Sequence, residues 1–247
     1  MAAGERAEGE LAARLSQYDA AIAYTANEAL VEALRRVIPA VQALSPKAQE
    51  PNIHASLTLA GPAYALGGRR NVEPKVHFPR AEDKAGADEW TGKLGGEGFL
   101  ALHPGSGSTR KNWPPERFAE LALTLARGRR FLVVEGPADE AAVAPLRERK
   151  DAVVARGLPL NTLGALLARA ALYVGNDSGV SHLAAAWGTP TVALFGPTEA
   201  TIWSPVGPRV RVLEAPAREW ARLDAATVAS AAREALRSWA RPALPCG

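Results

Sequence analysis

Residues 172–195, LYVGNDSGVSHLAAAWGTPTVALF, decide the fold. The apolar run 172–174 predicts a buried strand, and 191–195 predicts a second one. Between them, 179–187 has the pattern of a helix that ends at Gly188 and Pro190, two residue types that stop helices. A strand, a helix and a strand in this order are typical of a parallel α/β sheet.

The same alternation extends along the second half of the chain. Further strands are expected at 99–103, 131–134, 152–155 and 210–213, with helices at 117–126, 139–149 and 161–170. Six strands with helices between them predict a doubly wound, mostly parallel sheet. In the common strand order 3-2-1-4-5-6, ligands bind outside the carboxyl ends of strands 1 and 4, where the order reverses.

The first half reads as a less complete version of the same fold. Its expected elements are strands at 19–24 and 41–44 and helices at 28–37, 51–66 and 81–94. Gly, Arg, Pro and Glu in 67–78 indicate a linker. We therefore predict an incomplete N-terminal Rossmann-like domain with its linker (1–78) and a C-terminal Rossmann-like domain (79–223). In the last segment (224–247), a helix capped by Asp224 is expected to pack back toward the first domain.

Composition narrows the classes of function. Of the 247 residues, 47% are hydrophobic, and the net charge is +3, which is ordinary for a globular protein. Cys246 is the one cysteine, and the histidines at 54, 77, 103 and 182 are scattered, so neither a disulfide framework nor a metal site is expected. The basic residues are spread along the chain, which argues against a nucleic acid partner.

The sequence also bears on location. It has no apolar run of the ~18–20 residues that a spanning helix needs, and its N-terminus is charged where a secretory signal is apolar. We therefore expect a cytoplasmic protein. Weak peripheral contact with anionic lipid at the inner face of the cytoplasmic membrane would suit its basic balance, but +3 is too small for stable binding.

The loop after strand 1, residues 103–113, reads HPGSGSTRKNW. Gly105 and Gly107 would let the backbone come close to an anion. Ser106 and the hydroxyl groups that follow it offer donors, and Lys111 offers positive charge. This combination suits a diphosphate. The alternative is an ordinary Gly/Ser turn before a helix.

The loop after strand 4, residues 175–179, opens the next helix. Asp177 or Ser178 can cap that helix, and its first N–H groups favour an anion. Ser181 and His182 are expected to lie near the mouth, away from the buried stripe of the helix. The alternative is that Asp177 only caps the helix and that His182 is a surface histidine.

A hydrolase would need Ser106 or Ser178 as nucleophile, His182 as base and Asp177 as the group that orients it. No Gly-x-Ser-x-Gly elbow follows a strand. An aspartate five residues before its histidine, on one junction of loop and helix, is also poorly placed to orient that histidine.

Residues 103–118 and 174–198 together resemble the ADP-heptose:lipopolysaccharide heptosyltransferases, glycosyltransferase family nine. The resemblance runs from about 18 to 239 and is dense after 100. It implies a GT-B architecture, in which two Rossmann-like domains enclose the active site. It also implies transfer of a heptose from ADP-heptose to a sugar of the lipopolysaccharide core, with inversion and without a metal or other cofactor.

The resemblance also implies roles for individual residues. Ser106, Gly107 and Lys111 would hold the diphosphate. Glu140 would accept hydrogen bonds from the ribose, and Leu158 would line the adenine slot. The phosphates and the donor sugar would meet four further residues: Asp177, Ser178, Gly179 and His182.

One departure from the family leaves the catalytic residue unassigned. Family members have a Gly-Asp loop after their first strand, and its aspartate is taken as the base that deprotonates the acceptor. This chain contains no Gly-Asp pair. Two alternatives to an active transferase therefore stay open: a catalytically impaired protein that binds nucleotide sugars, and a gene fragment that lacks the base.

Overall fold

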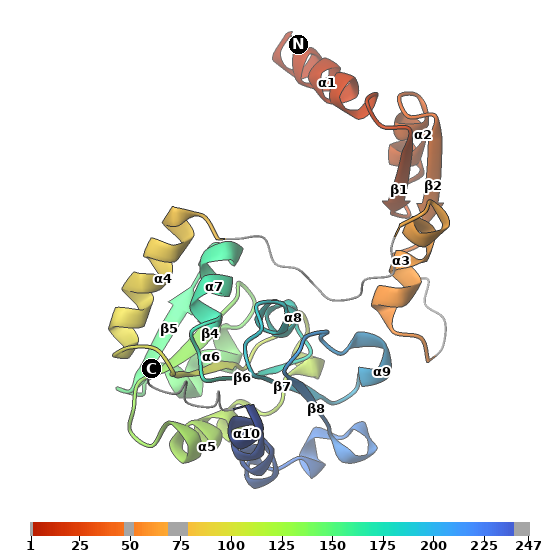
Figure 1. Cartoon of the computed structure of the whole chain (residues 1–247). Coiled ribbons are helices and arrows are strands. Elements are labelled where there is room, and N and C mark those ends of the chain that lie inside the picture. The colour runs from red at the N-terminus through yellow and green to blue at the C-terminus, as the bar shows by residue number, and fades with distance from the viewer. Residues whose placement is uncertain (1, 47–51, 69–78, 240–247) are drawn as a thin grey trace, which may run out of the picture. The chain divides into compact units, whose positions relative to one another are not determined.

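The structure, a computed structural model, describes residues 2–46, 52–68 and 79–239. The chain divides into two compact units, Met1–Val72 and Glu73–Gly247 (Figure 1). The boundary falls in the linker predicted at 67–78, most of which lies outside the described residues.

The first unit is built around two parallel strands. Its elements are α1 (Ala2–Leu15), β1 (Ala20–Tyr24), α2 (Glu28–Arg35), β2 (Ala40–Leu44) and α3 (Ala55–Ala65). In the part of this unit that is described, β1 and β2 form the sheet, with Ala20 opposite Ala40. The Asn27 side chain accepts the Leu30 N–H and so caps α2. The sequence analysis did not predict α1.

The second unit carries the larger sheet. Its elements are α4 (Ala81–Leu94), β3 (Leu100–His103), η1 (Thr109–Lys111), α5 (Pro115–Ala126), β4 (Phe131–Glu135), α6 (Glu140–Arg147), β5 (Ala152–Arg156), α7 (Leu160–Leu167), β6 (Leu172–Asn176), α8 (Gly179–Ala186), β7 (Thr191–Phe195), α9 (Ala200–Trp203), β8 (Val210–Glu214), η2 (Pro216–Arg218), η3 (Trp220–Arg222) and α10 (Ala225–Trp239).

The sheet of the second unit has the predicted strand order. Among the described residues it contains six strands in the order β5-β4-β3-β6-β7-β8, and each neighbouring pair is parallel. In chain order within this unit, that is 3-2-1-4-5-6, so the prediction of a doubly wound sheet is confirmed. The order reverses between β3 and β6.

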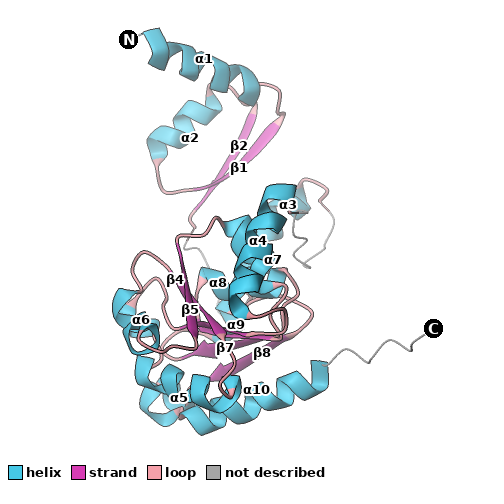
Figure 2. Ribbon diagram, turned by 90° about the vertical axis from the view of Figure 1, so that its left-hand side faces the viewer, coloured by secondary structure: helices cyan, strands magenta, loops and turns pink. Residues whose placement is uncertain are grey.

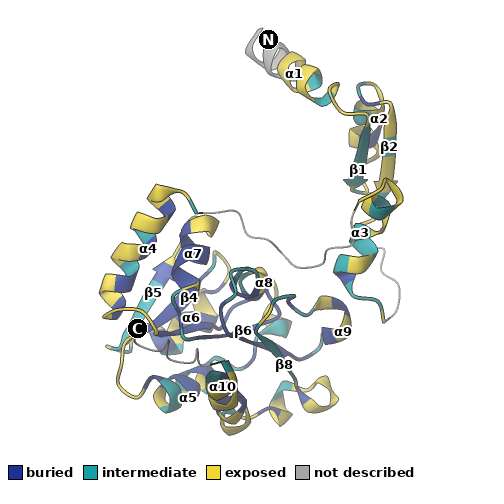
Figure 3. Cartoon of the chain, viewed as in Figure 1, coloured by how far each residue is buried: buried dark blue, intermediate teal, exposed yellow. Residues whose placement is uncertain are grey.

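Helices cover both faces of this sheet (Figure 2). Successive strand residues point to opposite faces, so Leu102 packs with α5, α6 and α10, whereas Ala101 packs with α4, α7 and α8. The central strands are buried along their length, as the dark ribbons of Figure 3 show. A fully buried Leu or Phe contributes about 1.5–3 kcal/mol, so this double-sided core accounts for much of the stability of the unit.

The last helix belongs to the core of the second unit. The buried side chains of α10 pack there, and its predicted packing toward the first domain stays a prediction. Four of the five are alanines, and small side chains allow α10 to approach α5 and the sheet closely. They are Val228, Ala229, Ala231, Ala232 and Ala235.

The start of α7 also differs. Asn161 or Thr162 was expected as its N-cap, but the helix begins at Leu160 after Pro159. The Thr162 hydroxyl instead donates to Asp83 of α4 at 3.1 Å. Of the helices in the described ranges, none has the length and apolar character needed to cross a bilayer.

Candidate functional site

Two loops that are distant in the sequence meet where the strand order reverses. β3 and β6 are neighbours, with His103 paired to Gly175. The loops that follow them are joined by Lys111, whose Nζ lies 3.0 Å from Asp177 Oδ2 and 3.4 Å from the Asp177 carbonyl oxygen. The topology therefore brings together the two loops that the sequence singled out as anion-binding.

The loop after β3 is held in shape by its own side chains. The Ser106 hydroxyl is buried, 2.7 Å from both the Ser108 carbonyl and Asn112 Oδ1, and it accepts the Ser108 N–H. Ser106 therefore shapes the loop with its side chain. Gly107 is exposed, and no atom lies within 4 Å of where a Cβ would stand.

Asn176, the last residue of β6, fixes both ends of that loop. Its side chain is buried, donates to the Pro104 carbonyl at 2.8 Å and accepts the Trp113 N–H at 3.1 Å. Asn176 was not among the residues predicted for the site. The sequence feature that could have identified Asn176 is a polar residue at the carboxyl end of a buried strand.

The start of α8 is the second half of the site. Ser178 is the N-cap and accepts the Ser181 N–H, while Gly179, the first helical residue, is exposed. N–H groups at such a start favour a negatively charged ligand. His182 is exposed within the first turn of this helix.

Ser181 was predicted near the mouth of the site, and this is wrong. It is fully buried, and its hydroxyl donates to the Asn176 carbonyl at 2.6 Å. It lies three positions after Ser178, so both lie on the inner face of the helix. Tyr173 Oη lies 3.0 Å from Ser181 Oγ, and burial raises the pKa of this phenol.

A buried chain of hydrogen bonds underlies both loops. His103 Nε2 lies 3.0 Å from Asp139 Oδ2, and His103 Nδ1 lies 3.1 Å from Ser178 Oγ. The side chains of His103 and Asp139 are only 4% and 5% exposed. Burial alone would raise the pKa of Asp139, but hydrogen bonds from His103, Gly136 and Ser106 lower it.

This series of hydrogen bonds argues against the hypothesis that the protein is a hydrolase. The Ser178 hydroxyl lies beside His103 Nδ1, and the acid beyond that imidazole is Asp139, while Asp177 pairs with Lys111. The imidazole is buried, and the Ser178 oxygen serves as a helix cap. Both features suit a structural role better than a nucleophile.

The two residues predicted for the nucleoside lie at the same edge of the sheet. Glu140 is the exposed first residue of α6, after β4. Leu158 follows β5 and is half-buried against the core cluster that includes α4 and α7. β4 is next to β3 and β5 is next to β4, so both residues lie in the row of loops that includes 103–113.

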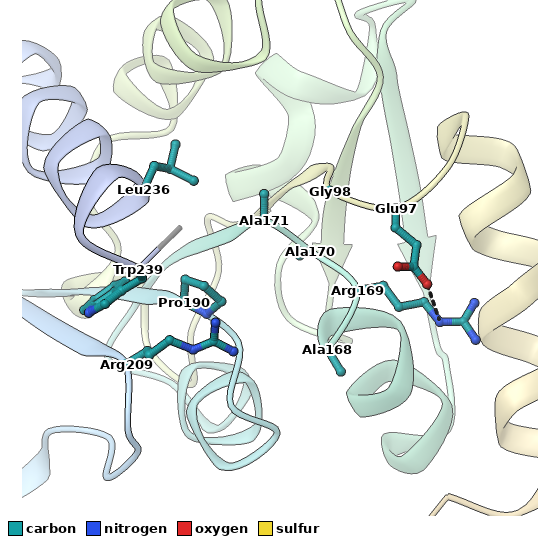
Figure 4. A pocket seen from close by; sticks show the side chains of 10 residues that line it. All are labelled: Glu97, Gly98, Ala168, Arg169, Ala170, Ala171, Pro190, Arg209, Leu236 and Trp239. Carbon is teal, nitrogen blue, oxygen red and sulfur yellow. Dashed lines mark ion pairs between the residues drawn. The ribbon is translucent and has the colours of Figure 1, made fainter. Parts of the chain in front are cut away.

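A cavity of about 490 Å³ lies at the opposite edge of the same sheet (Figure 4). Its lining includes residues that precede strands, such as Gly98 before β3 and Pro190 before β7. Arg169 on its wall pairs with Asp88 at 2.6 Å and with Glu97 at 3.9 Å. None of the predicted site residues lines it. Within the described residues, no group of three or more metal-ligating side chains is found.

A six-stranded parallel sheet with polar loops at its point of reversal is typical of nucleotide-binding Rossmann-like domains. The comparison with protein families agrees with this class of protein and identifies one family within it. The chain belongs to glycosyltransferase family 9 (heptosyltransferase), whose model matches residues 31–230.

Curated relatives match part of the chain. It is 34% identical over 121 residues to lipopolysaccharide heptosyltransferase 1 of Salmonella typhimurium, covering 48% of this chain and 38% of that protein. It is 30% identical over 118 residues to lipopolysaccharide heptosyltransferase 3 of Escherichia coli, covering 44% and 34%. The matched part thus spans little more than a third of these relatives.

Solved structures share the fold. A family 9 glycosyltransferase from Veillonella parvula superposes with a TM-score of 0.78 at 22% identity, over 94% of this chain and 78% of that one. The E. coli heptosyltransferase WaaC with ADP gives 0.68 at 21% identity, over 95% and 79%. These likenesses establish an α/β architecture of the GT-B kind.

Proposed function

We propose that the second unit binds the nucleotide half of an ADP-sugar, and that the protein transfers a heptose from ADP-heptose to a sugar of the lipopolysaccharide core. The observation that carries this proposal is the contact between Lys111 and Asp177. It brings a cation from one polar loop to the start of α8 in the other. The family of the chain supports the choice of ADP-heptose as donor.

The chemistry of the transfer accounts for this arrangement. When the acceptor hydroxyl attacks the anomeric carbon, the bond to the diphosphate breaks and negative charge grows on the departing ADP. The Lys111 ammonium and the free N–H groups of α8 are fixed in place before the reaction, so they would stabilise that charge more in the transition state than in the ground state. Attack from the face opposite the departing ADP gives inversion.

The remaining residues have complementary proposed roles. Gly107 would offer its exposed backbone to the diphosphate, in a loop that Ser106 shapes. Glu140 and Leu158 would contact the ribose and the adenine. The start of α8 would meet the phosphates and the donor sugar through Asp177, Ser178, Gly179 and His182. We propose no cofactor beside the nucleotide sugar, which is itself a substrate.

A second candidate function is nucleotide-sugar binding without turnover. These 247 residues contain no Gly-Asp pair, and the family resemblance takes the aspartate of such a pair as the base. Loss of a general base reduces the rate by about 10²–10⁴-fold.

Incubation with ADP-heptose and a heptose-deficient lipopolysaccharide separates the two functions. Release of ADP that requires the acceptor would establish transfer. If the protein binds ADP tightly but forms no ADP from ADP-heptose, the second candidate function would be established. Weak peripheral contact with the membrane is a further proposal, tested by sedimentation with anionic vesicles at low and at physiological salt.

A further inference from the structure

Asp139 lies where three loops of the second unit meet. Its Oδ2 accepts the Gly136 N–H at 2.7 Å and lies 3.0 Å from His103 Nε2. The Ser106 backbone N–H also lowers the pKa of this carboxylate. Because His103 Nδ1 reaches Ser178 at 3.1 Å, one buried acid connects the loop after β3, the loop after β4 and the start of α8.

Glycines leave room for this carboxylate. A Cβ on Gly105 would stand 1.9–2.3 Å from the carboxyl atoms of Asp139, and a Cβ on Gly136 would stand 2.7 Å from Oδ2. Gly105 was predicted to let the backbone approach a bound anion. In the structure, the anion that it approaches is the Asp139 side chain of the protein itself.

The surroundings of Asp139 require a carboxylate. The N–H groups of His103 and Gly136 donate to it, and the Ser106 backbone N–H further lowers its pKa. An ionised carboxyl offers two acceptor oxygens and no hydrogen. An asparagine would offer one oxygen and would place an NH2 group among these donors. Loss of the charge at this position would therefore disturb at least one of the three loops.

We propose that Asp139 is a positioning residue that holds the two anion-binding loops at the separation a diphosphate spans. It would do so through Ser106 on one side and through His103 and Ser178 on the other. The inference rests on the proposed function, because it concerns the same donor site. Asp139 itself is buried below the loops and is not placed in contact with the substrate.

If Asp139 positions the loops, its loss should change the affinity for a diphosphate more than the affinity for a monophosphate. ADP needs both the Lys111 loop and the start of α8 at the correct separation, whereas AMP carries one phosphate and depends less on that separation. A general loss of structure would weaken both ligands alike. The ratio of the two dissociation constants therefore reports positioning rather than stability.

The experiment is calorimetric titration of ADP and AMP into the full chain and three variants, each kept well below its Tm. Asp139→Asn removes the charge, and His103→Gln cuts the link to Ser178. Glu135→Gln is the matched control. Glu135 is also a buried acid and lies four residues before Asp139, but it pairs with Arg147 at 2.7 Å instead of with His103.

We expect Asp139→Asn and His103→Gln to weaken ADP binding by about tenfold or more and AMP binding by less than about threefold. Glu135→Gln should leave the ADP to AMP ratio as in the wild type. An unchanged ratio in both test variants, beside a wild type that prefers ADP, would overturn the inference and leave the proposed function intact. If Asp139→Asn does not fold, the ADP to AMP ratio of His103→Gln tests the inference instead. A wild type that binds neither nucleotide would overturn the proposed function and this inference together.

Discussion

The ammonium group of Lys111 lies 3.0 Å from a carboxylate oxygen of Asp177, although 66 residues separate them in the chain. The Lys111 side chain is 31% exposed and that of Asp177 is 9% exposed, so the cation faces solvent at the start of α8. A diphosphate bound there would share this cation with Asp177.

Replacing Lys111 with methionine tests this cation. Methionine keeps most of the length of the side chain and removes the charge, so ADP binding should weaken by about tenfold to a hundredfold. Calorimetric titration measures the change. Lys93→Met is the matched control, because Lys93 also pairs with an acid, Glu89 at 2.7 Å, and lies on α4. Equal affinity in the Lys111 variant and the wild type would remove Lys111 from the site.

Gly105 and Gly107 form a matched pair for stability. Alanine at Gly105 would place its Cβ 1.9 Å from the Asp139 carboxyl carbon, whereas alanine at Gly107 would meet no atom within 4 Å. Gly105→Ala should lower the free energy of unfolding by about 1–3 kcal/mol, and Gly107→Ala should change it by less than about 0.5 kcal/mol. Urea denaturation of both variants tests this, and similar losses would contradict the close contact with Asp139.

Asn176→Ala should be strongly destabilising. It removes a buried side chain that satisfies the Pro104 carbonyl and the Trp113 N–H, and both partners would then be left without their bonds. The expected loss is about 2–4 kcal/mol in the free energy of unfolding. Thr124→Ala on α5, which removes an exposed hydrogen bond, is the control and should change it by less than about 0.5 kcal/mol. A loss as small as that of the control would mean that Asn176 does not hold the loop.

Asp139 should make stability depend on pH at the acid end. Its pKa in the folded protein is below the ordinary value of 3.8, so its charge stabilises the fold fully above that value. This contribution is lost as the pH falls through 3.8 toward the lower folded pKa. The difference in unfolding free energy between the wild type and Asp139→Asn should therefore be largest at neutral pH and shrink below about pH 4. A difference that stays constant from pH 3 to 7 would contradict an ionised Asp139.

The strand order and the meeting of the two polar loops could be predicted from the sequence. Short apolar runs separated by helical patterns allow few topologies, and the loops after the first and fourth strands contain unusual polar residues. The contact between Lys111 and Asp177 follows from that topology. The bounds of α4 and the start of α10 after Asp224 also agree with prediction.

The buried network could not be predicted in the same way. His103 and Asp139 are 36 residues apart and belong to no shared motif, and only the pairing of β3 with β4 brings them together. Ser181 was placed on the outer face because a serine reads as polar. In the fold, it satisfies the Asn176 carbonyl below the helix. Such errors arise because a polar side chain can be buried only where the fold provides a hydrogen-bond partner. The sequence alone does not show which residue that partner is.

The most direct test of the central proposal is calorimetric titration of the chain with ADP, with UDP and GDP as controls. Micromolar binding that is selective for ADP and weakened by Lys111→Met is the predicted result. Absence of binding to any of the three nucleotides, or equal binding to all of them, would contradict a donor site for an ADP-sugar in the second unit.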